Sequence, residues 1–271
     1  MHYAISASTC AQAWVKGVEY LVGQPGKSAY NVILDVEAPH VITPTDRRAI
    51  ELLDNLLAQY KQYSIATVAG TIFPQGLYSR FGKKGVFDLY PNVVYPKIKG
   101  SSWGRYAYRI VRKHDSKGNL INPLERMVTK LKKQLVSDRT FRAVYELPLA
   151  DEFEIATYDP ENDADRLLPH PCLSHLSFKL TDDNTRIHLT ALYRSQYFLQ
   201  KALGNLVGLA QLQHFVAKEA GILPGGMVCI ATLATLDTAG IGGIDVAKAL
   251  LDGCLKTYSL ESGIQQHVEL A

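Results

Sequence analysis

The sequence predicts a single α+β domain, and three observations support this prediction. The chain has 271 residues, of which 47% are hydrophobic and 20% charged, enough to bury one large core. Runs rich in β-branched residues alternate with runs whose apolar residues recur at helical spacing. No internal repeat and no linker-like stretch divides the chain. We therefore expect residues 1–271 to form one domain.

Charge and cysteine usage exclude several classes of protein. The formal net charge of +3 is too small to predict a nucleic acid or a membrane as a partner. The four cysteines form no CxxC pair and have no histidine at metal-ligand spacing, so we expect no structural metal and no disulfide framework. No signal peptide and no apolar run of membrane-spanning length is visible. We expect a cytoplasmic protein.

The expected helices are marked by capping residues and glycines. Either Ser8 or Thr9 caps a helix that ends at Gly23. A second helix begins near Thr45, where apolar residues start to recur at helical spacing. Asn122 is followed by Pro and, three residues on, by Glu, which predicts a third helix start. The expected helices cover residues 9–23, 45–60, 122–135, 196–220 and 244–256.

The expected strands are β-branched or alternating runs bounded by prolines and turns. Pro39 stops the first run and Pro74 the second. Residues 182–185 are a four-residue turn that predicts a hairpin. The expected strands cover residues 31–37, 64–73, 141–147, 173–181, 186–193 and 227–232, with short strands near 86–87 and 93–94 in the loop-rich stretch 75–102.

Two glycine patterns have structural rather than functional interpretations. Gly204 and Gly208 lie four residues apart in the longest expected helix, which favours close packing of another helix. Residues 240–243 are glycine-rich and precede a helix, but they lack the spacing of a phosphate-binding fingerprint. We expect a turn there.

The strongest functional signal lies between His170 and Asp237. Cys172 begins an expected strand, and a thiol becomes a nucleophile as its thiolate, which a cation such as Arg194 would favour. The alternative is that Cys172 is a small buried apolar residue.

Two further residue types complete this signal. Arg194 and Ser195 lie at an expected strand-to-helix junction, where a guanidinium, a hydroxyl and helix amides suit a phosphate. A surface ion pair or a helix cap at Ser195 is the alternative. Asn205 lies within an apolar helix, and its carboxamide can read the amide edge of a base or make a buried structural hydrogen bond.

In order and spacing, these motifs resemble the thymidylate synthase family. Pro171-Cys172 matches the family's Pro-Cys-His nucleophile motif, and Tyr193-Arg194-Ser195 its Gln-Arg-Ser phosphate motif. Asn205 matches the helix Asn that reads the pyrimidine, and residues 221–225 match a Gly-Leu-x-Pro-Gly turn. The resemblance implies a large mixed β-sheet flanked by helices, and a homodimer packed sheet to sheet.

The N-terminal half resembles the family more loosely. Glu51, in Ala-Ile-Glu-Leu-Leu, would be the family's catalytic Glu. Trp103 stands with Gly104 where the family has a Tyr-Gly pair, and it would take a catalytic position. Arg142 matches one of two arginines that the family lends to the partner subunit's phosphate site.

The resemblance also implies a reaction. The thiolate adds to carbon 6 of a pyrimidine nucleotide, and carbon 5 then attacks a one-carbon unit carried by 5,10-methylenetetrahydrofolate. Arginines bind the 5′-phosphate and hold the ring over the thiol.

Several positions depart from the family pattern. Tyr193 replaces the motif Gln, and Leu173 replaces the His after the nucleophile. Tyr197 replaces the Asp that contacts folate. Thr235-Leu236-Asp237 replaces the His-x-Tyr that binds the deoxyribose hydroxyl, and Asp237 would pair with a ribose hydroxyl instead. Relatives that hydroxymethylate cytosine carry Asp at the Asn205 position, so Asn205 favours a uracil-type ring.

Three hypotheses follow. The first is a thymidylate synthase-like transferase, a methyl- or hydroxymethyltransferase, that modifies carbon 5 of a pyrimidine nucleotide through Cys172. The second is a nucleotide-binding or sensor protein that keeps the fold and the phosphate site without folate chemistry. The third is an unrelated cysteine hydrolase, for which His170, His175 and His188 are candidate partners.

Overall fold

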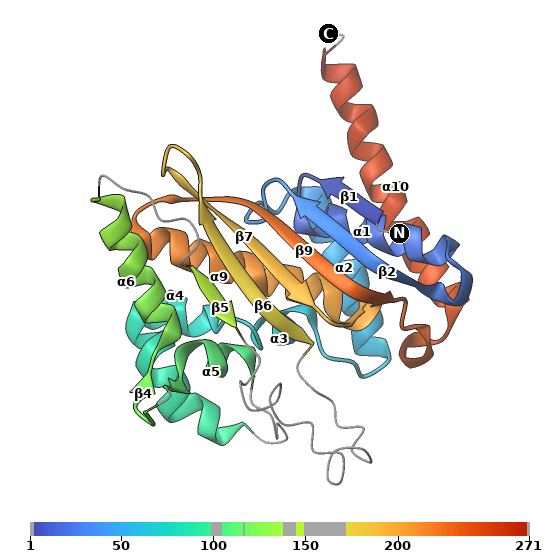
Figure 1. Cartoon of the computed structure of the whole chain (residues 1–271). Helices are drawn as coiled ribbons and strands as arrows, with labels where there is room; N and C mark the ends of the chain where they lie inside the picture. The colour runs from blue at the N-terminus through green and yellow to red at the C-terminus, as the bar shows by residue number, and fades with distance from the viewer. Residues whose placement is uncertain (1–2, 99–104, 116, 138–144, 149–171, 270–271) are drawn as a thin grey trace.

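The computed structural model describes residues 3–98, 105–115, 117–137, 145–148 and 172–269, with side chains through residue 259 (Figure 1). The described strands form a seven-stranded mixed sheet in the order β1-β2-β9-β7-β6-β5, with β8 paired to β9. The pairs β1–β2, β7–β9 and β8–β9 are parallel, and the others are antiparallel. The strands of this sheet are β1 Tyr3–Ala7, β2 Ser28–Val36, β5 Glu146–Pro148, β6 Leu173–Leu180, β7 Arg186–Tyr193, β8 Gln196–Tyr197 and β9 Leu223–Thr235.

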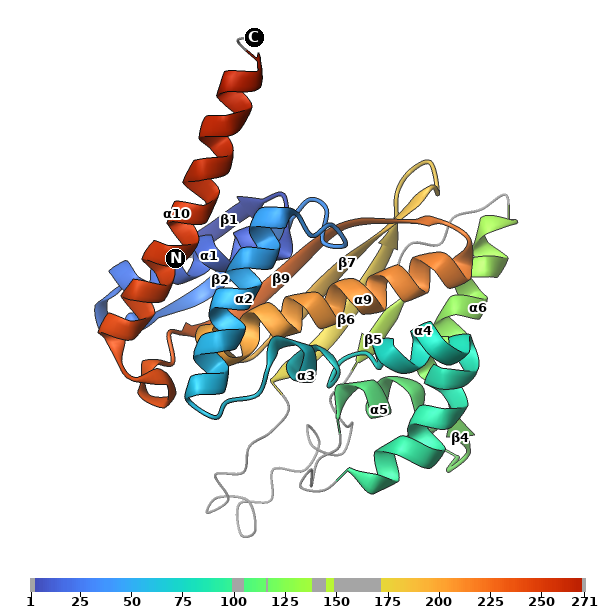
Figure 2. The same cartoon turned by 180° about the vertical axis from the view of Figure 1, so that it is seen from behind.

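Helices cover one face of this sheet. Figures 1 and 2 show α1, α2 and α9 on the same side of the strands, with α9 running across the middle. The α-helices are α1 Cys10–Gly23, α2 Pro44–Gln59, α3 Ile65–Ala69, α4 Gln75–Lys84, α5 Tyr106–Val111, α6 Pro123–Leu135, α9 Leu203–Ala220 and α10 Ile244–Glu269. The remaining elements are the 3-10 turns η1 Pro25–Lys27, η3 Tyr95–Lys97 and η6 Thr238–Ile241, the π-helices η2 Gly85–Val94 and η5 Phe198–Ala202, and the two-stranded sheet of β3 Lys113–His114 and β4 Leu120–Ile121. The predicted mixed sheet flanked by helices is confirmed. None of the described helices is long and apolar enough to cross a membrane.

The helix starts expected from capping residues are found in the structure. The Thr9 hydroxyl accepts a hydrogen bond from the amide of Gln12 at 3.2 Å at the start of α1. The Asn122 side chain accepts one from Glu125 at 3.0 Å and begins α6. Helix α2 begins one residue earlier than expected, because Thr43 and Asp46 form a reciprocal capping box around Pro44.

The expected close approach of a helix at Gly204 and Gly208 is also confirmed. A methyl group added to Gly204 would lie 2.5 Å from Cβ of Val68, and one added to Gly208 would lie 2.8 Å from the carbonyl oxygen of Ala69. These glycines therefore allow α3 to lie directly on α9.

Three element predictions are wrong. Residues 64–73 are not a strand, because the Ser64 hydroxyl caps Thr67 and the Asp54 carboxylate accepts the amide of Ile65 at 2.8 Å, which starts α3. The loops expected over residues 75–102, with short strands near 86–87 and 93–94, are helical over the described residues 75–97, where α4, η2 and η3 follow one another. The helix expected over 196–220 begins only after β8 and η5.

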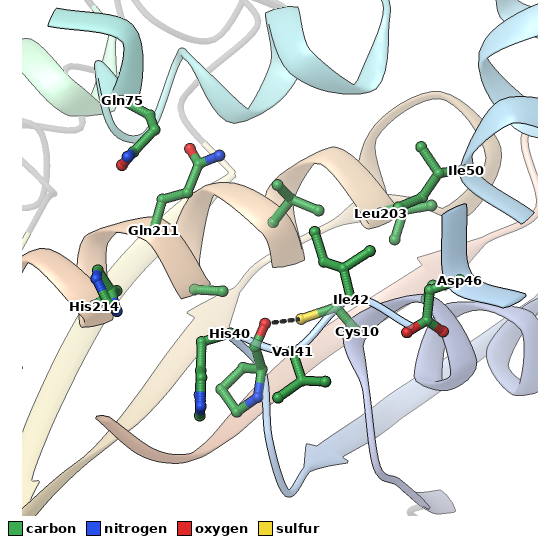
Figure 3. A pocket seen from close by; sticks show the side chains of 14 residues that line it. Cys10, His40, Val41, Ile42, Asp46, Ile50, Gln75, Leu203, Gln211 and His214 are labelled. Carbon is green, nitrogen blue, oxygen red and sulfur yellow. Dashed lines mark hydrogen bonds between the residues drawn. The ribbon is translucent and has the colours of Figure 1, made fainter. Parts of the chain in front are cut away.

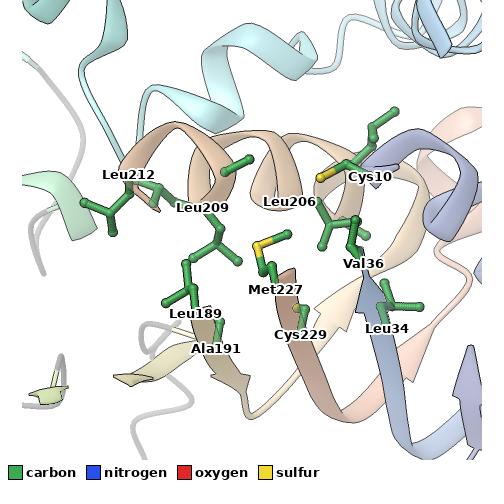
Figure 4. Close-up of a cluster of buried hydrophobic side chains, with 14 of the residues drawn as sticks. Cys10, Leu34, Val36, Leu189, Ala191, Leu206, Leu209, Leu212, Met227 and Cys229 are labelled. Carbon is green, nitrogen blue, oxygen red and sulfur yellow. The ribbon is translucent and has the colours of Figure 1, made fainter. Parts of the chain in front are cut away.

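The core lies between α9 and the inner face of the sheet. Figure 4 shows Leu206, Leu209 and Leu212 of α9 above Leu189 and Met227 of the strands. Burying side chains of this size contributes about 1.5–3 kcal/mol each.

A buried carboxamide ties α9 to the strands. The Nε2 atom of Gln213 donates to the carbonyl oxygens of Ile187 at 2.8 Å and of Gly225 and Gly226 at 3.1 Å. Because these carbonyls lie where β7 meets β9, the helix position is fixed relative to both strands.

The opposite face of the sheet carries apolar side chains. Strand alternation points Ile33, Leu192 and Ile230 away from α9. The strand register places Ile230 directly between Ile33 and Leu192, and all three side chains are half-buried. This row, the outer apolar row, is not covered by any of the described helices (Figures 1 and 2).

Candidate functional site

Cys172 and Arg194 lie next to each other at the open end of the β6–β7 hairpin, opposite its turn. Leu173 pairs with Tyr193, and the amide of Arg194 donates to the carbonyl oxygen of Cys172 at 2.8 Å. The expected hairpin therefore brings together two residues that are 22 positions apart in the sequence.

Burial and a neighbouring charge shift the pKa of the Cys172 thiol in opposite directions. Burial raises the pKa of Cys172, and the positive charge of Arg194 opposes this effect. The Cys172 side chain is half-buried and Arg194 is exposed. The other cysteines are buried, and burial raises the pKa of Cys10, Cys229 and Cys254. Cys172 is thus the described cysteine best placed to react.

Tyr106 holds the backbone beside the thiol. Its hydroxyl oxygen accepts hydrogen bonds from the amides of Cys172 at 2.8 Å and Leu173 at 3.1 Å. Burial raises the pKa of Tyr106, so the hydroxyl keeps its proton near neutral pH. The sequence analysis missed this residue because Tyr106 lies on α5, 66 positions before Cys172. No local pattern links the two.

Tyr193, expected to contact substrate, is fully buried on the inner face of β7. Its hydroxyl has no hydrogen-bond partner within the described part of the chain, and burial raises its pKa. Gln196 is buried close by: its Oε1 accepts from the thiol of Cys229 at 3.9 Å, whereas its Nε2 lacks a partner among the described residues. In this arrangement Tyr193 faces the protein interior.

The expected phosphate-binding pair lies on an irregular turn. Arg194 is exposed and Ser195 is half-buried. The carbonyl of Arg194 accepts from the hydroxyl of Thr232 at 2.6 Å, which fixes the backbone of the turn. The next helical element, η5, starts only after Tyr197 and has no side-chain cap, so Ser195 does not cap it.

Asn205 lies in the first turn of α9 and is 7% exposed. Its carboxamide is thus almost fully removed from solvent near the start of the helix.

Asp237, expected near a ribose hydroxyl, has a structural contact instead. Its two carboxylate oxygens accept from the amides of Leu199 at 2.8 Å and Gln200 at 3.2 Å, at the start of η5. Burial raises the pKa of Asp237, and these hydrogen bonds oppose the shift. The carboxylate thus caps backbone amides.

The remaining candidates are distributed over the chain. Glu51 is exposed on α2, and Tyr197 is 51% exposed in β8. Trp103 and Arg142 lie outside the described residues, and so do His170 and Pro171.

The histidines of the hydrolase hypothesis can be placed in part. His175 contacts Glu146 at 2.5 Å in a cluster with Ser177 and Lys179. His188 is exposed on β7 beside Gly225. Among the described residues no group of three or more His, Cys, Asp or Glu side chains is arranged to hold a metal ion.

Comparison with known proteins gives partial similarity. No protein-family model matches the chain. A stretch of 64 residues, 24% of the chain, is 38% identical to 29% of a Methanococcoides burtonii protein named "Putative thymidylate synthase". A second protein of the same name, from Methanosarcina mazei, is 36% identical over 61 residues, which are 22% of this chain and 27% of that protein. The matches thus span less than a third of either relative, and they support a thymidylate synthase-like relationship over about a quarter of the chain.

Proposed function

We propose that this protein is a thymidylate synthase-like transferase that acts at carbon 5 of a pyrimidine nucleotide through a covalent adduct with Cys172. The observation that carries the proposal is the pairing of Cys172 with Arg194 at one end of the β6–β7 hairpin. The partial matches to proteins named as thymidylate synthases support the same class of reaction.

The proposed chemistry begins with the thiolate. When the sulfur adds to carbon 6, the S–C6 bond forms and the ring π electrons move to carbon 5 and the carbonyl, so carbon 5 becomes nucleophilic. The guanidinium of Arg194 favours the thiolate and binds the anionic 5′-phosphate. Tyr106 holds the backbone amides at Cys172 and Leu173, which limits the movement of the sulfur.

Asn205 would make the site selective for a uracil-type ring. A carboxamide can donate to a carbonyl oxygen and accept from the ring N–H of a uracil-type base at the same time. The exposed Arg194 would hold the nucleotide by its phosphate, as expected from the sequence.

A one-carbon donor is needed for transfer to carbon 5, and the resemblance implies 5,10-methylenetetrahydrofolate. At Tyr197, which stands where the family has its folate-contacting Asp, the side chain fits this cofactor poorly. Tyr197 offers an exposed aromatic face but no carboxylate to accept the N–H groups of a pterin.

We also propose a homodimer packed sheet to sheet through the outer apolar row of Ile33, Leu192 and Ile230. This row supports the proposal because its side chains are apolar and lie on the face of the sheet that the described helices leave uncovered.

Release of tritium from carbon 5 tests the covalent mechanism. Nucleotides labelled at carbon 5 should lose tritium to water with the wild-type protein, and Cys172→Ala should abolish the release. Cys254→Ala, a buried cysteine of α10, is the matched control and should retain it. Release that persists unchanged in Cys172→Ala would contradict the covalent adduct.

A nucleotide-binding or sensor function is the second candidate. It is favoured by the engagement of Asp237 in backbone capping and by the exposed Tyr197 at the folate position. Calorimetry with uracil and cytosine nucleotides, in ribose and deoxyribose forms, with and without methylenetetrahydrofolate, separates the two candidates. Binding without a folate effect and without tritium release would support the sensor.

A further inference from the structure

A cavity of about 260 Å³ lies on the helical side of the molecule (Figure 3), and Cys172 is not among the residues that line it. It is bounded by α1, residues 39–42, α2, the start of α4 and one side of α9. The α9 residues that line it include Leu203, Val207 and His214, whereas Asn205 lies about 160° around the helix from Leu203 and Val207. The cavity is therefore separate from the proposed nucleotide site.

One part of the cavity is apolar. Ile50, Leu203 and Val207 form its wall, and Figure 3 shows Ile50 and Leu203 at the end that also holds Asp46. Val41 and Ile42 line the same space, although 40% and 49% of their surfaces are exposed to solvent. Large apolar side chains exposed around a concave surface are typical of a ligand site, because a bound apolar group would remove them from water.

The other end of the cavity gathers hydrogen-bonding side chains, among them two exposed histidines. Figure 3 shows His214, Gln211 and Gln75 together at this end, with His40 below them. Burial lowers the pKa of His40, and the charges of His214 and Arg186 lower it further. These charges disfavour protonation of His40, so an anion bound beside the ring would favour its protonated form and be bound more tightly by it.

The polar groups at the Asp46 end of the cavity already have hydrogen-bond partners within the protein. Oδ1 of Asp46 accepts from the hydroxyls of Thr9 at 2.8 Å and Tyr258 at 2.6 Å, and Oδ2 accepts from the amide of Thr43 at 2.8 Å. The thiol of Cys10 contacts the carbonyl of Pro39 at 3.4 Å, and burial raises its pKa, so it stays neutral. Neither group requires a ligand, and the Asp46 charge would keep an anion at the histidine end.

We propose that this cavity binds a small carboxylate with an apolar chain, with the carboxylate against His40 and His214 and the chain along Leu203 and Val207. The volume sets the size of the ligand. At about 30 Å³ for each water-sized group, the cavity holds roughly nine such groups. A six-carbon carboxylate fits this space, and a long-chain fatty acid does not.

Titration of the full chain with hexanoate tests the proposal, with histidine ring resonances followed by NMR. Hexanoate should bind saturably and shift the resonances of His40 and His214. Hexanamide has the same size without the charge, and it should bind about tenfold more weakly because it loses the charge-assisted hydrogen bonds. Equal binding of the two compounds, or no shift at either histidine, would overturn the proposal.

Variants assign the binding to this cavity. His214→Gln should weaken hexanoate about tenfold and leave hexanamide unchanged, whereas the matched control His114→Gln, an exposed histidine of β3, should bind hexanoate like the wild type. Val207→Phe fills the apolar end and should abolish binding of both compounds. Cys172→Ala should bind hexanoate normally, which separates this site from the proposed nucleotide chemistry. Binding that survives Val207→Phe would place the ligand elsewhere and contradict the proposal.

Discussion

The amide of Arg194 donates to the carbonyl oxygen of Cys172 at 2.8 Å. This backbone contact places the guanidinium of Arg194 and the thiol of Cys172 at neighbouring positions of one hairpin. The backbone of both residues is fixed by neighbouring groups: Tyr106 accepts the amide of Cys172, and Thr232 donates to the carbonyl of Arg194. A pair positioned by backbone contacts keeps its geometry before any ligand binds, which is the property that a nucleophile and its electrostatic partner require.

Arg194→Ala should make Cys172 less reactive. With the guanidinium removed, its positive charge no longer opposes the effect of burial, so the pKa of the thiol rises and less thiolate is present at a given pH. The measurement is the rate of iodoacetamide modification between about pH 7 and pH 9. The rate profile should move to higher pH, and nucleotide affinity should fall about tenfold or more. Arg80→Ala, an exposed arginine of α4, is the control. An unchanged profile would show that the two side chains do not interact.

Tyr106→Phe should destabilise the protein. The amides of Cys172 and Leu173 would lose their acceptor, at a cost of about 1–3 kcal/mol for each buried donor left unsatisfied. Tyr193→Phe is the contrasting variant, because the Tyr193 hydroxyl has no partner among the described residues. Its removal should leave the free energy of unfolding unchanged or raise it by about 1 kcal/mol. Urea unfolding measures both. Equal losses in the two variants would contradict the contacts assigned to Tyr106.

Gly208→Ala should destabilise the contact between α3 and α9. The added methyl group would lie 2.8 Å from the carbonyl oxygen of Ala69 and 3.0 Å from Cβ of Ile72, so α3 would have to move. The expected loss is about 1–3 kcal/mol in thermal or urea unfolding. Gly253→Ala is the matched control, because its methyl group would be 3.5 Å from the nearest atom, Cδ1 of Leu52, and it should stabilise α10 by about 0.5–1 kcal/mol. A gain in stability for Gly208→Ala would refute the close packing.

Local sequence determined much of this fold. The caps at Thr9 and Asn122 and the turn at residues 182–185 act within a few residues, so they are readable from the sequence. The hairpin then predicts that Cys172 and Arg194 are neighbours. Residues 64–73 were mistaken for a strand because Ile65, Thr67 and Val68 favour one, and contacts with α9 override that preference.

Long-range contacts account for the parts of the site that the sequence did not predict. Tyr106 reaches Cys172 only because α5 folds against the sheet, and no spacing rule reports such a contact. Asp237 matched a position expected to bind a sugar, but the π-helix η5 turns its unpaired amides towards the carboxylate. A residue type alone cannot distinguish a carboxylate that binds ligand from one that caps a backbone.

Ile230→Lys should separate the proposed dimer. Ile230 lies at the centre of the outer apolar row, between Ile33 and Leu192, and two lysines brought together across a symmetric interface would repel each other. Analytical ultracentrifugation should find a dimer for the wild type and a monomer for the variant. Ile42→Lys replaces an exposed isoleucine of the helical side and should remain dimeric. A monomeric wild type would contradict the homodimer.

The stability of the protein should fall as the pH decreases through the range in which His40 titrates. Burial, His214 and Arg186 lower the pKa of His40 from its ordinary value of 6.5. The unfolded chain therefore binds a proton at this position before the folded protein does, so the free energy of unfolding decreases below about pH 6.5. His40→Gln removes this contribution, and its stability should depend less steeply on pH between about 7.5 and 5.5. Ile42→Val alters the same cavity without removing a titratable group and should keep the wild-type slope.

Hexanoate should reduce the slope of the wild type, because a carboxylate beside His40 favours the protonated ring in the folded state. A wild-type slope that hexanoate leaves unchanged would separate His40 from the proposed ligand.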